Sequence, residues 1–267
     1  MDRRYQTTDD FLSGGARTNF EVRAMARLSP PSSEKWEEFA QKDPFNYILT
    51  TLKGADRREF WQSGVHTIQE EFLPLLQLYK VRPLLGLELG CGVGRLVVPL
   101  TRRFQEVVGV DIARGMLQRA VSFTRDNSIK NASFLLVSGP EDFLRRAAKY
   151  AGSCDFIYSL LVFQHIPEFP IIEDYLHVIR VLLHKRGLAY LQFDTRPKDF
   201  LYRLKIQLPD CLLPRFWRRG IRRIRRSPEE IAACIRQAGM EIVQELTPRT
   251  AYHRYILRLS QCPLKSK

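Results

Sequence analysis

Short apolar runs alternate with amphipathic stretches along the chain from Pro83 onward. Such runs predict buried strands, and amphipathic stretches of about ten or more residues predict helices. The expected strands are 84–89, 106–110, 133–137, 155–160, 188–193, 241–245 and 254–259. The expected helices lie at about 94–103, 113–126, 141–150, 171–184 and 228–239. This order is typical of βα units, so we expect an α/β fold with a seven-stranded, doubly wound sheet.

The chain before Pro83 follows a different pattern. Residues 1–43 are polar and are expected to form an extension that contains one short helix at about 35–41. Over 44–80, apolar residues recur at roughly helical spacing between acids and amides, which predicts a helical lid element. The α/β domain is then expected to span 81–267.

One interval does not fit the alternation. Residues 195–226 lie between the fifth strand and the last helix, where we expect a helical insertion. Within it, Trp217, Ile221 and Ile224 are spaced to form one apolar stripe on an arginine-covered helix. Such a helix either packs its stripe on the domain as a lid or lies on an anionic lipid surface. The pattern leaves both alternatives open.

Charge is concentrated in the same interval. The 267 residues carry a net charge of +13, and seven arginines without any acid lie between Arg215 and Arg226. This segment keeps a polyanion-binding protein, for RNA or for a membrane surface, as an alternative function. Apolar content of 45% and charged content of 27% exclude a wholly disordered chain.

Targeting and metal signals are weak. No run of about 18 apolar residues occurs, and the first ten residues lack the apolar core of a secretory signal, so we expect a cytoplasmic protein. The cysteines at 91, 154, 211, 234 and 262 include no C-x-x-C pair, which disfavours a zinc or redox centre. We expect no metal.

The most specific feature is a glycine-rich turn after the first strand. Gly90, Gly92 and Gly94 remove Cβ atoms where the chain turns tightly and where a ligand can approach the backbone. The spacing matches neither G-x-G-x-x-G nor a Walker loop, so a nicotinamide oxidoreductase and an ATPase are disfavoured. A glycine-rich turn without any ligand is the structural alternative.

Two acids accompany this turn. Glu88 stands two residues before Gly90, at the carboxyl end of the first strand. Asp111 directly follows the second strand, where an acid can accept hydrogen bonds from both hydroxyls of a ribose. A helix cap is the alternative role for Asp111. Together with the glycine turn, the two acids favour a ligand that contains a nucleoside.

These motifs, with DFIYS at 155–159 and VFQHIP at 162–167, resemble the class I S-adenosylmethionine-dependent methyltransferases over roughly 83–260. The resemblance implies a Rossmann-like methyltransferase domain at 81–267 and S-adenosylmethionine as cofactor. It implies that the glycine turn and Glu88 hold the methionine end, that Asp111 holds the ribose, and that Glu141 or Asp142 faces the adenine. The implied cofactor residues are Glu88, Gly90, Cys91, Gly92, Gly94, Asp111, Ile112, Met116, Glu141, Asp142, Ser159 and Leu160.

His165, just beyond the fourth strand, is the candidate general base, because a histidine exchanges a proton near neutral pH. Its alternative role is to cap a turn or to pack against Pro167. The chain has no Asn/Asp-Pro-Pro-aromatic motif after the fourth strand and no Pro-Cys pair, so nucleic-acid amine and cytosine C5 methylation are disfavoured. We therefore expect O- or N-methylation of a small, hydrophobic or anionic acceptor, with peripheral membrane contact as an option.

Overall fold

The computed structural model describes residues 32–45, 57–214, 217–218 and 223–260. The chain divides into two compact units, 1–30 and 31–267, and every described residue belongs to the second. Most of the expected extension 1–43, part of the expected lid element 44–80 and Ile221 therefore lie outside the described residues.

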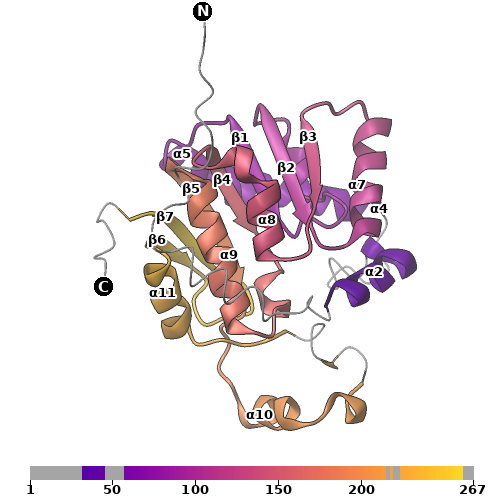
Figure 1. Cartoon of the computed structure of the whole chain (residues 1–267), viewed down its shortest axis with the longest axis vertical. Coiled ribbons are helices and arrows are strands. Elements are labelled where there is room, and N and C mark those ends of the chain that lie inside the picture. The colour runs from indigo at the N-terminus through magenta and orange to yellow at the C-terminus, as the bar shows by residue number, and fades with distance from the viewer. Residues whose placement is uncertain (1–31, 46–56, 215–216, 219–222, 261–267) are drawn as a thin grey trace, which may run out of the picture. The chain divides into compact units, whose positions relative to one another are not determined.

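The second unit is built on a seven-stranded mixed sheet (Figure 1). The strands are β1 (Leu85–Leu89), β2 (Glu106–Asp111), β3 (Ala132–Leu136), β4 (Cys154–Ser159), β5 (Leu183–Phe193), β6 (Met240–Leu246) and β7 (His253–Leu259). Their spatial order is β3-β2-β1-β4-β5-β7-β6, with β1 to β5 parallel and β7 antiparallel to both neighbours. The expected seven-stranded, doubly wound sheet is confirmed. Its strand order reverses between β1 and β4, where α/β sheets of this kind bind ligands.

Helices cover both faces of the sheet. On one face, α8 (Pro140–Arg146), α9 (Phe169–Leu182) and α11 (Pro228–Gln237) share a core cluster with β1, β4 and β5. On the other, α6 (Val97–Leu100), α7 (Arg114–Asp126) and the helical segment 68–78 share a second cluster. Local signals fix the ends: the hydroxyl of Ser227 accepts hydrogen bonds from the amides of Glu229 and Glu230 at the start of α11. Gly239, with φ of 77°, follows its end.

The N-terminal helices lie against the sheet and the glycine turn. They are α2 (Ser32–Lys42), α4 (Arg57–Thr67), the π-helix η3 (Ile68–Phe72) and α5 (Leu73–Leu78). Phe72 is fully buried and packs edge-on against the rings of Phe156 and Tyr158, at 5.0 Å in each case. A Cβ at Gly64 of α4 would lie 2.2 Å from the carbonyl oxygen of Arg95, so only glycine permits this approach.

Two expectations for individual helices are wrong. The helix expected at 94–103 contains only α6 as regular α-helix, flanked by turns. The predicted stripe of Trp217, Ile221 and Ile224 does not share one helix, because residues 223–226 are not helical and the amide of Ile224 donates to the carbonyl of Gln164. The insertion instead contains α10 (Phe200–Gln207) and a short 3-10 turn, η6 (Asp210–Leu212). Within the described ranges, no helix combines the length and apolar character needed to cross a bilayer.

Candidate active site

The glycine turn between β1 and α6 is fixed by the neighbouring strand β2. Gly90, Gly92 and Gly94 have φ of 75°, 54° and 86°, in the left-handed region that side chains disfavour. The amides of Gly90 and Cys91 both donate to the carbonyl of Val110, at 2.7 and 3.0 Å. The turn therefore presents bare backbone in a defined shape at the carboxyl end of β1.

Cys91 points its side chain into the protein, where its thiol donates a weak hydrogen bond to the carbonyl of Gly92 at 3.7 Å. Its side chain is buried within the core cluster on the α6 side of the sheet. Burial raises the pKa of its thiol well above the ordinary value, and the nearby charge of Asp111 raises that pKa further. A neutral, inward-facing thiol is unsuited to nucleophilic chemistry, which needs the thiolate.

Asp111 links the glycine turn to the helix that follows β2. Its Oδ2 accepts a hydrogen bond from the amide of Gly92 at 2.7 Å, and its Oδ1 accepts one from the amide of Ala113 at 2.9 Å. Burial raises the pKa of this carboxyl, although both hydrogen bonds oppose the shift. A carboxylate accepts about four hydrogen bonds, so each oxygen keeps capacity for a ligand hydroxyl. Asp111 is not the cap itself, because the N-cap of α7 is Ala113 and no side chain bonds the first turn there.

Glu88 is a buried acid with one unsatisfied oxygen. Its Oε2 has no hydrogen-bond partner in the described part of the chain, and 4% of the residue is exposed. Burial raises the pKa of Glu88 well above its ordinary value, which the positive charge of Arg95 partly offsets. A buried polar atom without a partner calls for an explanation, and a cationic ligand group beside the glycine turn would supply one.

Polar groups from three elements surround Glu88. Tyr158 of β4 is its register partner across the parallel pair, and the buried hydroxyl of Tyr158 lies close enough to Glu88 to lower the pKa of that acid. Arg95 donates to the hydroxyls of Ser63 and Thr67, at 3.3 and 3.5 Å, and burial lowers its pKa. Helix α4 thereby closes the inner side of the glycine turn.

Helix α2 brings residues to the site that the sequence interpretation missed. The Oε2 of Glu37 accepts a hydrogen bond from the amide of Gly115 at 3.0 Å, and its charge adds to the raised pKa of Asp111. The ring of Trp36 lies edge-on to that of His165, with centroids 5.4 Å apart. The only local signal for this docking was the presence of aromatic residues at helical spacing in a polar segment.

Four further candidate residues are placed around the same turn. Met116 is buried beneath α2, in a cluster with the glycine turn and the start of α7. Ile112 is half-buried and packs on the α8 and α9 side of the sheet. Ser159 is fully buried, and its hydroxyl donates to the carbonyl of Leu89 at 2.9 Å. Leu160 is half-buried against the opposite core cluster.

The two acids considered for the adenine differ in their surroundings. Asp142 is committed to the start of α8, where it accepts from the amide of Ser138 at 3.0 Å and pairs with Arg145 and Arg146. Burial alone would raise the pKa of Asp142, but the hydrogen bonds from Arg146, Ser138 and Arg145 outweigh it and lower the pKa. Glu141 is exposed and makes no hydrogen bond or ion pair within the described ranges.

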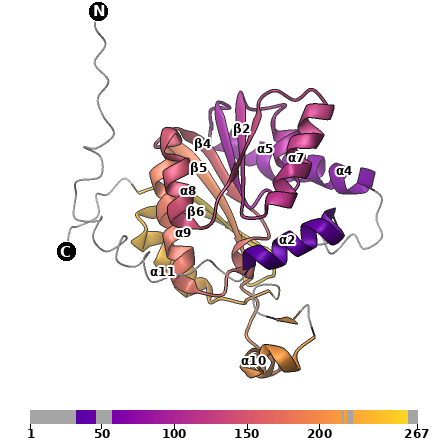
Figure 2. The same ribbon diagram turned by 45° about the vertical axis from the view of Figure 1, so that its right-hand side comes forward.

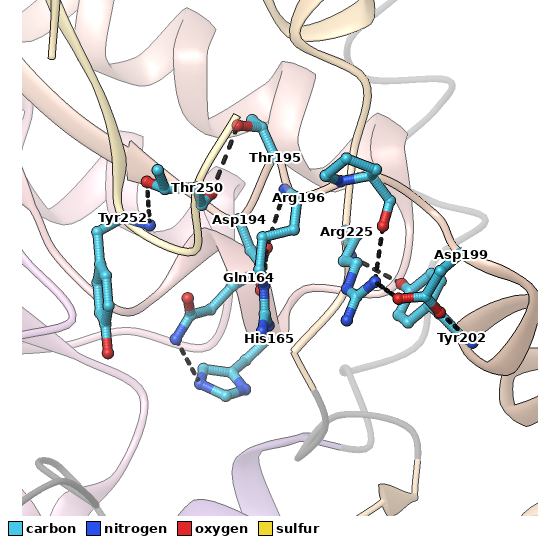
Figure 3. A network of polar contacts seen from close by, with 11 residues as sticks. Gln164, His165, Asp194, Thr195, Arg196, Asp199, Tyr202, Arg225, Thr250 and Tyr252 are labelled. Carbon is cyan, nitrogen blue, oxygen red and sulfur yellow. Dashed lines mark hydrogen bonds and ion pairs between the residues drawn. The ribbon is translucent and has the colours of Figure 1, made fainter. Parts of the chain in front are cut away.

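His165 lies at the carboxyl end of β4, in the 3-10 turn η5 (Phe163–His165) (Figure 3). The side-chain amide nitrogen of Gln164 lies 3.2 Å from Nε2 of His165. The same segment reaches the glycine turn, since a Cβ at Gly90 would lie 2.2 Å from Cγ2 of Val162. The candidate base and the candidate cofactor turn therefore meet at one sheet edge.

The insertion crosses this edge as it returns to α11. The amide of Ile224 donates to the carbonyl of Gln164 at 2.7 Å, and the amide of Arg226 donates to the carbonyl of Asp194 at 2.9 Å. The carboxylate of Asp194 is buried and is bound by Nε and Nη2 of Arg196, at 3.0 and 2.6 Å (Figure 3). Among the described residues, no three acid, histidine or cysteine side chains gather as metal ligands would.

A surface hollow of about 550 Å³ lies at the opposite edge of the sheet. It is lined by Arg82, Glu106 and Asp155 among others, at the amino ends of β1, β2 and β4. Asp155 is buried there and is held by Nε and Nη2 of Arg82, at 2.9 and 2.7 Å. Ligands of open α/β sheets bind at the carboxyl ends, so this hollow is separate from the candidate site.

A family model described as "Methyltransferase domain" matches residues 55–245, which is more than half of the chain. The chain belongs to this methyltransferase family. The resemblance to the class I, S-adenosylmethionine-dependent methyltransferases is thereby confirmed, with S-adenosylmethionine as the cofactor. The match covers the glycine turn, Asp111 and His165. Strands β1 to β5 lie within it, as does β6 apart from its last residue, and β7 lies beyond it.

Curated relatives of this methyltransferase differ in acceptor. The 23S rRNA (uracil(1939)-C(5))-methyltransferase RlmD of Xanthomonas oryzae pv. oryzae is 25% identical over 214 residues, covering 67% of this chain and 47% of that protein. The ubiquinone biosynthesis O-methyltransferase of Marinobacter nauticus is 29% identical over 173 residues, covering 62% and 66%. The chain thus spans about half the length of the rRNA methyltransferase.

Solved structures share the fold. Magnesium protoporphyrin IX methyltransferase from Synechocystis, with bound S-adenosylhomocysteine, superposes with a TM-score of 0.58 at 19% identity, covering 85% of this chain and 97% of that chain. A methyltransferase from Clostridium acetobutylicum superposes with a TM-score of 0.56 at 15% identity, covering 81% and 98%. At such low sequence identity, these similarities show a shared fold and nothing about the acceptor.

Proposed function

We propose that this methyltransferase transfers a methyl group to an oxygen or nitrogen atom of a small-molecule acceptor bound beside His165. The observation that carries the proposal is the contact between Gly90 and Val162, three residues before His165. It brings the glycine turn and the candidate base to the same edge of the sheet. An acceptor held at the carboxyl ends of β4 and β5 would then lie beside both.

The residues present fit the cofactor. In this proposal, the bare backbone of Gly90, Gly92 and Gly94 lies against the methionine end, and Glu88 receives its ammonium group. Asp111 receives the ribose hydroxyls, and Glu141, the less engaged of the two acids, is the better candidate for the adenine. When bound, S-adenosylmethionine supplies a methyl group on a sulfonium, whose leaving group is a neutral thioether. The protein therefore has to align, desolvate and deprotonate rather than form a covalent intermediate.

His165 is assigned as the general base. In the tautomer that carries its proton on Nδ1, Nε2 of His165 accepts from the side-chain nitrogen of Gln164 at 3.2 Å. The lone pair on Nε2 is the one that an acceptor hydroxyl or ammonium would use in place of Gln164. Trp36 packs edge-on against the ring and restricts its rotation. A base held in this way removes one proton as the new bond to carbon forms.

RNA is the second candidate acceptor, supported by the arginine-rich segment and by the rRNA-modifying relatives. Methylation of a pyrimidine at C5 needs a thiolate that adds to the ring. Cys91, Cys154 and Cys234 are buried, and burial raises the pKa of the latter two to about 12. Cys211 is exposed in the η6 turn of the insertion, and Cys262 lies outside the described residues. The environment of the core cysteines favours O- or N-methylation.

Transfer from tritiated S-adenosylmethionine to a panel of phenols, carboxylic acids and amines, with total cellular RNA in parallel, tests the proposal. We expect label in at least one small-molecule class, and a loss of about 100-fold or more in His165→Ala at unchanged cofactor affinity. His66→Ala, an exposed histidine of α4, is the matched control and should retain full activity. Label in RNA alone, or equal turnover of His165→Ala and wild type, would contradict the proposal.

A further inference from the structure

Helix α10 of the insertion exposes a continuous apolar face. Phe200, Leu201, Leu204 and Leu208 are 78%, 64%, 47% and 37% exposed, and no residue of α10 is buried. At 100° per residue these four side chains fall within one stripe about 100° wide. Figures 1 and 2 both show α10 beyond the carboxyl edge of the sheet. Contiguous exposed apolar side chains of this size usually mark an interaction surface.

The opposite side of α10 is firmly attached, so the stripe is not exposed by loose packing. The hydroxyl of Tyr202 accepts a hydrogen bond from the amide of Arg225 at 2.7 Å. The guanidinium of Arg225 pairs with Asp199 at 2.8 Å, and Asp199 also caps the helix by accepting from the amide of Tyr202. Figure 3 shows the side chains of Asp199 and Tyr202 next to Arg225, which belongs to the segment that leads back to α11. The helix is therefore held with its apolar face turned outward.

The stripe lies within the most basic part of the chain. Residues 195–226 contain eleven lysines and arginines against two aspartates, a net charge of +9 out of the chain's +13. Two further apolar side chains, Leu212 and Trp217, are 69% and 37% exposed. The Nζ of Lys205 lies 3.8 Å from the ring centroid of Trp217, which joins the helix to the arginine-rich segment.

We propose that α10, with Leu212, Trp217 and the basic residues Lys198, Arg203, Lys205 and Arg218, docks on an anionic lipid bilayer. The apolar stripe would enter the boundary between headgroups and acyl chains, and the lysines and arginines would contact lipid phosphates. A second copy of the chain is a poorer occupant, because two copies of this surface, each with more basic than acidic residues, repel each other. RNA is poorer too, since four of the six exposed apolar side chains of this surface are leucines, which offer no stacking surface to bases.

The docking surface is connected to the acceptor edge. In the segment 223–226, which leads back to α11, the amide of Ile224 donates to the carbonyl of Gln164, the residue next to His165. A methyltransferase anchored in this way would receive its acceptor from the membrane, which makes an amphiphilic, lipid-soluble acceptor the substrate class. This last step rests on the proposed function, whereas docking itself does not.

Co-sedimentation of the full chain with vesicles tests the docking. We expect binding to phosphatidylcholine vesicles that contain about 30% phosphatidylglycerol, weaker binding to phosphatidylcholine alone, and a decline as salt is raised. The double variant Phe200→Ser/Leu204→Ser should bind at least tenfold more weakly. Leu78→Ser, at a 66% exposed leucine of α5, is the matched control and should bind like wild type. Lys198→Glu should reduce the preference for anionic vesicles.

Several results would overturn the docking proposal. The first is that the wild-type chain does not sediment with anionic vesicles, and the second is that the double variant binds them as well as wild type does. The third is that the chain forms a concentration-dependent dimer and that substitutions in the stripe do not change vesicle binding. Circular dichroism and cofactor calorimetry on each variant identify any that fails to fold, and Leu201→Ser then replaces it. Vesicle binding without transfer to any small molecule would reject the proposed function and leave docking intact. Docking with transfer only to water-soluble acceptors would reject the lipid-soluble substrate class.

Discussion

Gly90 and Val162 touch across the carboxyl edge of the sheet, so closely that a Cβ at position 90 would lie 2.2 Å from Cγ2 of the valine. The glycine also has φ of 75°. Its lack of a side chain thus serves two purposes: the loop can turn, and the segment after β4 can approach it. The position of the candidate base relative to the cofactor turn depends on this contact.

Gly90→Ala should therefore weaken cofactor binding by at least about tenfold and lower the free energy of unfolding by about 1–3 kcal/mol. Calorimetry and chemical denaturation measure the two effects. Gly152→Ala is the matched control, because Gly152 has φ of 63° but would have no atom within 4 Å of its Cβ. Val162→Ala in the Gly90→Ala background should recover part of the affinity. If the two glycine variants lost equal free energy of unfolding, backbone strain alone, and not the contact with Val162, would be responsible.

Glu88→Gln should uncouple stability from pH. Burial raises the pKa of Glu88, so the folded chain holds this proton more tightly than the unfolded chain does. The resulting contribution to stability is present below the unfolded value and is lost as pH rises through the folded value. Glutamine carries no such proton, so at pH 8 the cofactor-free variant should be at least as stable as wild type. Denaturation between pH 5 and about pH 8 measures the slope.

The same substitution should have the opposite effect on the cofactor. A cationic methionine end favours the ionised form of Glu88, so wild-type affinity should increase as pH rises. The variant should bind about tenfold or more weakly, with a flatter pH dependence, because a charge-assisted hydrogen bond is lost. Parallel pH profiles of the two proteins would rule out Glu88 as the ligand of the ammonium group.

Phe39→Ala tests the role of α2. Phe39 is 5% exposed and packs with Val93, Ala113 and Met116 of the glycine turn and α7. Removing a buried aromatic ring costs about 3–5 kcal/mol where the whole fold must respond, and less where one helix detaches. We expect detachment of α2, seen as faster hydrogen exchange in 32–42, together with several-fold weaker cofactor binding. Unchanged cofactor affinity despite rapid exchange would show that α2 packs on the site without contributing to it.

The sheet and the glycine turn were predictable because their signals are local. Apolar runs fix the strands, and Gly90, Gly92 and Gly94 sit where the backbone adopts positive φ. The contribution of α2 was not predictable, since Glu37 reaches Gly115 across 78 positions of sequence and its segment is polar. Sequence spacing alone also could not separate Asp142 from Glu141, because two arginines one turn later engage only the former.

The insertion shows how the spacing of apolar residues can mislead. Trp217, Ile221 and Ile224 follow helical spacing, yet Ile224 is not in a helix, and its amide donates to the carbonyl of Gln164 instead. The amphipathic helix lies instead at 200–207, where the apolar residues are exposed rather than buried. A hydrophobic pattern alone does not show whether its face is covered by the same chain.

Calorimetric titration of the purified chain with S-adenosylhomocysteine tests the central claim most directly. The account predicts saturable binding at one site per chain, and a loss of at least tenfold in affinity for Asp111→Ala with the fold retained by circular dichroism. Absence of binding to the wild-type chain, or identical affinity in Asp111→Ala, would contradict the assignment of the glycine turn and Asp111 as the cofactor site.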